Sequence, residues 1–168
     1  LGGGGVGRWG RGAAVGAGEA GAAGAVAGVV GPGWGAPSPG LARAFAAGAA
    51  AHGLDVTLIG LCSTDGLYYA SGALDLPGAM FTASHNPAQY NGIKLCRSGA
   101  RPVGQDTGLS QVRDLAQSML DSGSEAPAGE PGTGLISERD VLADYATFFR
   151  GLVDLSEIRP LSVVVGAG

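Results

Sequence analysis

The sequence predicts an α/β fold, a three-layer α/β/α sandwich around a mixed, mostly parallel sheet. Near-continuous apolar runs, such as residues 56–61 and 79–81, are typical of strands buried on both faces of a sheet. Helical patterns of ten or more residues separate the strand-like runs, as in chains that form parallel or mixed sheets. The 168 residues, 45% of them apolar, suit one domain with a sizeable core, or one domain and the start of another.

The first two thirds of the chain alternate strands and helices. Residues 26–31 predict a first strand. Ser38 as N-cap and Pro39 at the first helical position then open a helix, which Gly53 ends. The further elements are a strand at 56–61, a helix at 65–73 capped by Ser63 or Thr64, strands at 79–81 and 93–96, and a helix at 108–120.

The last third of the chain predicts a linker, a helix and a strand. The linker, rich in Ser, Gly, Pro and Glu, spans 121–134, and a helix over 137–153 follows it with Ser137 as N-cap. Its expected buried side consists of Leu142, Tyr145, Phe148, Phe149 and Leu152. Residues 161–165 predict a new strand. Because an unpaired terminal strand would be an exposed edge, we expect a longer protein to continue beyond it.

Composition excludes several classes of function. The net charge of −4 and the absence of a basic patch argue against nucleic acid as a partner. No glycine-free apolar run reaches about 18 residues, so we expect no membrane span. Cys62 and Cys96 lack metal or redox spacing, which predicts buried thiols in a reducing, cytoplasmic setting.

The chemistry of the chain is concentrated in one loop and the strand after it. The loop Thr82–Pro87 gathers the hydroxyl of Ser84, the imidazole of His85 and the amide of Asn86. Lys94, the only lysine, lies in the middle of the next apolar run. A reactive loop on a rigid sheet has this form. Taken singly, each residue also fits a structural role, such as a plain turn or a solvated lysine.

Two kinds of chemistry are open to Ser84. In a hydrolase, His85 would act as its base, but adjacent residues in an extended segment point to opposite faces, and the Gly-x-Ser-x-Gly elbow is absent. Phosphoryl transfer fits better, because a hydroxyl on a tight loop can carry the group. Lys94 can then neutralise charge or exchange a proton.

Several segments together resemble a known family. Thr82-Ala-Ser-His-Asn-Pro87, followed by Tyr90-Asn-Gly-Ile-Lys94, is similar to the phosphoserine signature of the α-D-phosphohexomutases, in particular the bacterial phosphomannomutase/phosphoglucomutase group. Residues 60–65 and 99–103 fit the same family, and the resemblance runs from about residue 38 to residue 165. It implies the first domain of a four-domain enzyme that interconverts the 1- and 6-phosphates of mannose or glucose.

The resemblance also implies roles for the site residues. Ser84 would carry a phosphoryl group and pass it to a hexose phosphate, with a hexose 1,6-bisphosphate as intermediate and activator. Lys94 would be a general acid/base or a phosphate-neutralising group, and His85 a second participant near the sugar hydroxyl. Thr82 and Asn86 would hold the loop or bind phosphate, together with Lys94. Mg²⁺ would bind Ser84 through its phosphate.

The first 37 residues depart from the pattern of this family. Nearly half of the 33 glycines lie in residues 1–35, a composition typical of a low-complexity arm, and two expected motifs with Asp and Arg are missing. One hypothesis is that residues 1–37 are a frameshifted translation of a GC-rich gene, which resequencing tests. The expected division is this atypical segment, the α/β/α domain at 38–158, and the start of a second domain at 159–168.

The motifs of the family's later domains are absent from these residues. The chain supplies at most one Mg²⁺ ligand, the phosphoserine oxygen, whereas Mg²⁺ requires octahedral oxygen coordination. We therefore expect the chain to be inactive without the missing C-terminal domains, which are its expected partners besides a hexose phosphate. The alternatives are a non-catalytic phosphate-binding α/β module and a non-functional truncated product.

Overall fold

A computed structural model describes residues 27–87, 90–123 and 134–166 of the chain. The elements are β1 (Ala27–Pro32), α2 (Ser38–Ala50), β2 (Asp55–Leu58), α3 (Thr64–Leu74), β3 (Gly78–Thr82), β4 (Gly92–Arg97), β5 (Arg101–Pro102), the 3₁₀ helix η1 (Gln105–Thr107), α4 (Leu109–Asp121), β6 (Ile136–Glu138) and α5 (Leu142–Arg150). The low-complexity arm predicted before residue 27 and most of the predicted linker lie outside the described residues.

A six-stranded mixed sheet forms the middle of the molecule, with strand order β5-β4-β3-β1-β2-β6. The strand β1 pairs in parallel with β2 on one side and β3 on the other, and β6 runs parallel to β2. On the opposite side, β4 and β5 add antiparallel strands. The predicted α/β class with a mixed sheet is therefore confirmed.

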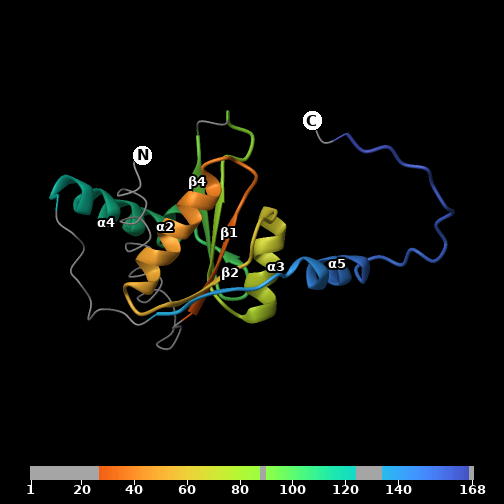
Figure 1. Ribbon diagram of the computed structural model, residues 1–168, viewed down its shortest axis with the longest axis horizontal. Coiled ribbons are helices and arrows are strands. Elements are labelled where there is room, and N and C mark those ends of the chain that lie inside the picture. The colour runs from red at the N-terminus through yellow and green to blue at the C-terminus, as the bar shows by residue number, and fades with distance from the viewer. Residues whose placement is uncertain (1–26, 88–89, 124–133, 167–168) are drawn as a thin grey trace.

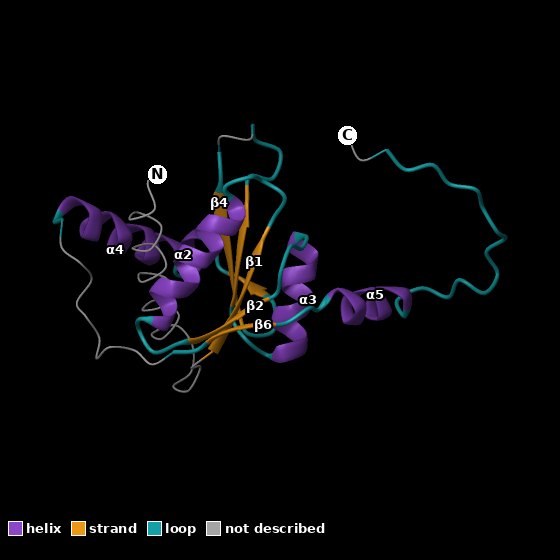
Figure 2. Ribbon diagram, in the orientation of Figure 1, coloured by secondary structure: helices purple, strands orange, loops and turns teal. Residues whose placement is uncertain are grey.

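Helices cover both faces of this sheet (Figures 1 and 2). Val30 and Phe81 face α2 and α4, whereas their neighbours Val29 and Met80 face α3. Successive strand residues point to opposite faces, so each apolar strand contributes to two cores at once. Phe81 is fully buried, and its ring packs edge-on against Phe45 of α2 with centroids 5.4 Å apart. The result is the expected α/β/α sandwich.

The predicted helix caps are right at α3 and wrong at α2. Ser63 caps α3, since its Oγ accepts a 3.0 Å hydrogen bond from the backbone N–H of Gly66. At α2 the N-cap is Pro37, which makes no side-chain cap hydrogen bond, and Pro39 is the second helical residue, not the first as predicted. The hydroxyl of Ser38 instead accepts a hydrogen bond from the side chain of Asn91, 53 positions later in the chain.

The predicted helix over 137–153 begins later than expected. Residues Ile136–Glu138 form β6 along the open edge of β2, where Ser137 lies opposite Thr57. Ser137 is therefore not an N-cap, because strand pairing competes with helix formation. The side chain of Asp140 instead accepts a 2.8 Å bond from the N–H of Leu142, at the true start of the helix.

The apolar side of α5 is not buried as predicted. None of its residues is buried, and the expected core residues Leu142, Phe148 and Phe149 are 67%, 51% and 62% exposed. Its contact with the domain is an aromatic one, in which Tyr145 and Phe148 lie 5.5 and 5.2 Å from the ring of Tyr69 on α3.

The predicted strand at 161–165 is also not formed. Residues 152–166 run outward from α5, exposed and without a strand partner among the described residues (Figure 1). The edge strands of the described sheet are β5 and β6, and residues 161–165 pair with neither of them. In the described part of the chain, no helix has the length and apolar character required to cross a membrane.

Candidate active site

The serine loop, residues 83–91 between β3 and β4, lies where the connections from neighbouring strands lead to opposite sides of the sheet. From the central strand β1 the chain crosses to β2 on one side, whereas from β3 on the other side it turns outward into β4. In open α/β sheets, ligands bind in the crevice outside the carboxyl ends of the strands at such a switch point. The loops 33–37 and 83–91 follow β1 and β3, which are parallel and therefore end at the same edge of the sheet.

The turn that carries Ser84 is tightly constrained. The backbone N–H of Ser84 donates to Oγ1 of Thr82 at 3.0 Å, and the N–H of Asn86 donates to the carbonyl of Ala83 at 3.0 Å. Ser84 has a φ of 53°, a left-handed conformation that costs a non-glycine residue about 1–2 kcal/mol. Such strain persists where the surroundings fix it, and it concentrates at functional sites.

Ser84 is exposed at the tip of this turn, together with His85 and Asn86. Thr82, the last residue of β3, is half-buried and supplies the hydrogen bond that fixes the turn. Across the described residues the Ser84 hydroxyl forms no hydrogen bond, so it remains available to a substrate. The structure thus places three of the five predicted site residues in one turn, with Thr82 at its base.

The fifth predicted residue, Lys94, lies on the same hairpin but not in the loop. It is exposed on β4 and pairs with Met80, whereas Gly92 at the end of the hairpin pairs with Thr82. At about 3.4 Å per residue, Lys94 therefore lies roughly 7 Å along the strand from the base of the loop. Its long side chain must extend along the hairpin to approach Ser84.

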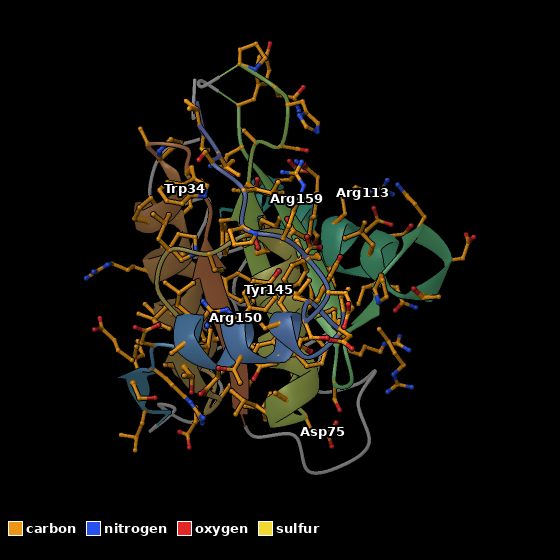
Figure 3. All side chains as sticks on the ribbon, turned by 90° about the vertical axis from the view of Figure 1, so that its right-hand side faces the viewer. Trp34, Asp75, Arg113, Tyr145, Arg150 and Arg159 are labelled. Atoms are coloured by element: carbon orange, nitrogen blue, oxygen red, sulfur yellow. The ribbon has the colours of Figure 1, made fainter. Side chains whose placement is uncertain are left out.

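The loop after β1 packs closely against the end of β3. The N–H of Gly33 donates to the carbonyl of Phe81 at 2.7 Å, and a Cβ at position 33 would lie 2.9 Å from that oxygen, so only glycine fits here. Figure 3 shows Trp34 of this loop at the same end of the molecule as the serine loop, with Asp75 at the opposite end.

A cross-link that the sequence did not predict joins the serine loop to the start of α2. Nδ2 of Asn91 donates to Oγ of the fully buried Ser38 at 2.9 Å. Ser38 begins α2, whose first turn carries no acidic residue. The N-terminus of a helix bears a partial positive charge and favours anions. A hydrogen bond between residues far apart in the chain has no periodic signal in a sequence, and Asn91 had been noted only as part of the Tyr90-Asn-Gly-Ile-Lys94 motif.

Of the two thiols, Cys96 is buried and Cys62 is half-buried. Burial raises the pKa of the Cys62 thiol to about 11. Burial also raises the pKa of Cys96, although hydrogen bonds with Ser71 and the backbone of Gly78 partly oppose the rise. Both cysteines are free, as the lack of a pairing motif indicated.

We expect Cys62 to react slowly with a disulfide reagent such as DTNB at pH 8. With a pKa near 11, its thiolate fraction at pH 8 is about 200-fold smaller than that of an ordinary thiol of pKa near 8.5. The stability gained by keeping this thiol neutral is present below about pH 8.5 and is lost as the pH rises toward 11. A Cys96→Ala chain, assayed folded and in urea, isolates Cys62; equal rates in both states would contradict the assignment.

The described residues do not form a metal centre by themselves. Among them, no group of three or more His, Cys, Asp or Glu side chains could hold a metal ion. The turn around Ser84 offers hydroxyls, an amide and an imidazole, but no carboxylate. By itself this donor set does not complete a site for Mg²⁺, which requires near-octahedral oxygen coordination.

These features define a class: an α/β domain with a strained, exposed serine at a topological switch point. The chain belongs to the phosphoglucomutase/phosphomannomutase family, because the family model for its alpha/beta/alpha domain I matches residues 19–119. This match confirms the resemblance that the serine motif indicated.

Individual relatives agree with this assignment. A phosphohexose mutase of Xanthomonas campestris is 43% identical over 132 residues, and a phosphomannomutase of Salmonella typhimurium is 37% identical over 132 residues. Each alignment covers 78% of this chain but only 28% of the relative. The chain therefore spans less than a third of their length.

A solved structure shows the same fold. The crystal structure of a phosphoglucomutase/phosphomannomutase family protein from Burkholderia thailandensis superposes with a TM-score of 0.70 at 28% identity. The superposition covers 94% of this chain and 33% of that protein. A putative phosphomannomutase from Thermus thermophilus gives a TM-score of 0.69 at 26% identity, covering 89% and 32%.

Proposed function

We propose that this chain is the phosphoserine-bearing domain of a hexose phosphate mutase, with Ser84 as the phosphoryl carrier. One observation carries the proposal: an exposed serine held at a left-handed φ of 53° directly after the carboxyl end of β3, at the switch point of the sheet. A serine held this way presents its hydroxyl to a ligand in the crevice and is pre-ordered before the ligand arrives.

The proposed reaction consists of two phosphoryl transfers, and a different phosphoryl group moves in each. The bond between Ser84 Oγ and phosphorus breaks as a hydroxyl of a hexose monophosphate bonds to that phosphorus, and Ser84 takes up a proton. The sugar, now a 1,6-bisphosphate, reorients. Its other phosphoryl group then returns to Ser84, which gives the proton back. The net result is a phosphate moved between positions 1 and 6 of mannose or glucose.

Neighbouring side chains would support each transfer. Lys94 would neutralise developing charge or exchange the proton, and His85 would lie near the sugar hydroxyl. Thr82 and Asn86 would keep the turn in place and offer polar contacts to phosphate. The N-terminus of α2, free of acidic residues, would favour the phosphorylated form electrostatically.

Magnesium and the remaining domains belong to the same proposal. Mg²⁺ would neutralise phosphate charge when bound, and this chain would contribute the phosphate of Ser84 and leave the other ligands to domains outside residues 1–168. The hexose phosphate and those domains are the proposed partners, and the cytoplasm is the proposed location. The division into 1–37, 38–158 and 159–168 also remains a prediction.

We expect the 168-residue chain alone to show no mutase turnover, because it supplies one side of a composite site. The assay combines the chain with glucose 1-phosphate, glucose 1,6-bisphosphate and Mg²⁺, and measures glucose 6-phosphate. Turnover above a boiled-protein control would contradict this expectation. Intact-mass analysis of the same sample reports a phosphate on Ser84, which a merely phosphate-binding module would not acquire.

A further inference from the structure

We propose that Ser38 and Asn91 form a positioning pair that fixes the serine loop against the N-terminus of α2. The inference rests on the proposed role of Ser84, since it concerns where the phosphoserine is held. Neither residue is proposed to touch the reacting atoms, since both act by holding the loop.

Ser38 is placed for this role rather than for helix capping. It is the first residue of α2 and is 0% exposed, and the N-cap position before it is Pro37, which makes no side-chain cap hydrogen bond. Oγ of Ser38 accepts the 2.9 Å bond from Nδ2 of Asn91. A buried hydroxyl without a partner is costly, so this pairing is strongly preferred over an open one.

Asn91 is fixed at both ends of its amide group. Nδ2 donates to Ser38, and Oδ1 accepts a 2.9 Å bond from the N–H of Gly92, the first residue of β4. One residue earlier, the N–H of Tyr90 donates to the carbonyl of Pro87 at 2.9 Å. The returning arm of the serine loop is therefore anchored to α2 as well as to its own hairpin.

The other arm of the loop is anchored independently. Thr82 pairs with Gly92 in the ladder, and its Oγ1 accepts the N–H of Ser84. Gly35 packs over the cross-link, because a Cβ there would lie 3.2 Å from Oγ of Ser38 and 3.8 Å from Nδ2 of Asn91. With both arms fixed, a phosphate on Ser84 has a defined position relative to α2.

The electrostatic surroundings of that phosphate can be measured without any catalysis, through its pKa. Phosphoserine is installed at position 84 during synthesis of the full chain, and ³¹P NMR follows its titration between pH 4 and 8. A free phosphoserine has a second pKa near 6. Near a helix N-terminus we expect the phosphate pKa to be lower by about 0.2 to 0.7.

Loss of the cross-link should remove most of this effect. In Ser38→Ala and in Asn91→Ala chains we expect the phosphate pKa to return to within about 0.1 of the value in the urea-unfolded chain. The double variant should shift no further than either single variant, because the two residues act through one bond. Circular dichroism checks that each variant is folded.

The matched control is Ser63→Ala, which also removes a serine hydroxyl at the start of a helix. It should leave the phosphate pKa unchanged, although it costs a similar amount of stability. Equal shifts in Ser38→Ala and Ser63→Ala, or full additivity of Ser38→Ala and Asn91→Ala, would overturn the proposal. If Ser38→Ala does not fold, Asn91→Ala in the half-buried loop carries the test alone.

The outcome is separable from the proposed function. A lowered phosphate pKa that depends on Ser38 and Asn91 supports the positioning pair even if no mutase activity is found. The proposal of a positioning pair is contradicted if the phosphate pKa is the same in the folded and the unfolded wild-type chain. This holds whatever the activity of Ser84 in a complete enzyme.

Discussion

Ser84→Ala abolishes turnover in an enzyme that contains this domain; this is the largest effect we expect. The suitable protein is a chimera in which residues 27–166 replace the matching part of the Xanthomonas campestris phosphohexose mutase. Removing a nucleophile that acts as a unit with its neighbours typically costs about 10⁴-fold or more in kcat. The measurement is the conversion of glucose 1-phosphate to glucose 6-phosphate, coupled to a dehydrogenase.

The control for this experiment is Ser137→Ala, at an exposed serine on β6 far from the loop in sequence. It should retain the activity of the parent chimera. Both proteins are compared with the parent by intact mass, because the parent and Ser137→Ala should carry phosphate and Ser84→Ala should not. Substantial turnover by Ser84→Ala would assign the phosphoryl carrier to another residue.

Phe81→Ala is expected to destabilise the domain by about 3–5 kcal/mol, as truncations of buried aromatic residues typically do. The side chain is 0% exposed and lies in the sheet next to the central strand, against Phe45. Domains commonly have a free energy of unfolding of only about 5–15 kcal/mol, so this loss is a large fraction of the total stability. Urea unfolding followed by circular dichroism gives the difference in free energy of unfolding.

Phe149→Ala provides the matched control, since it removes the same side chain from α5, where it is 62% exposed. We expect a change within about 0.5 kcal/mol. Similar losses from both variants would mean that the core around β3 is looser than its burial indicates. Because Phe81 is three residues from Ser84, Phe81→Ala should also loosen the serine loop, which hydrogen exchange at the amide of Asn86 would report.

The parallel core could be predicted because its signals are local. Val56, Met80 and Phe81 lie in short apolar runs that are bounded by turns, and these runs became β2 and β3. The cap at Ser63 was also predictable, since its partner is three residues away. The loop around Ser84 is similarly local, and its residues were found together for that reason; whether they act as proposed remains a prediction.

The errors arose where distant residues decide the structure. Ser137 fits a helix start by its own sequence, but the open edge of β2, 80 residues earlier, draws it into β6. Ser38 fits a helix cap by its own sequence, but its hydroxyl accepts a hydrogen bond from Asn91, 53 residues later. Leu142 and Phe149 have the spacing of a buried face, but a periodic pattern does not say whether another surface is present to cover it.

The place of β1 in the sheet has a practical consequence for anyone who shortens this protein. Ala27–Pro32 separates β2 from β3, and both of these strands bond to it along their length. A chain that starts at Ser38 would keep all the helices described and the whole serine motif, yet its sheet would be divided into two halves with two new unsatisfied edges. Truncation before residue 27 and truncation after residue 32 are therefore different experiments.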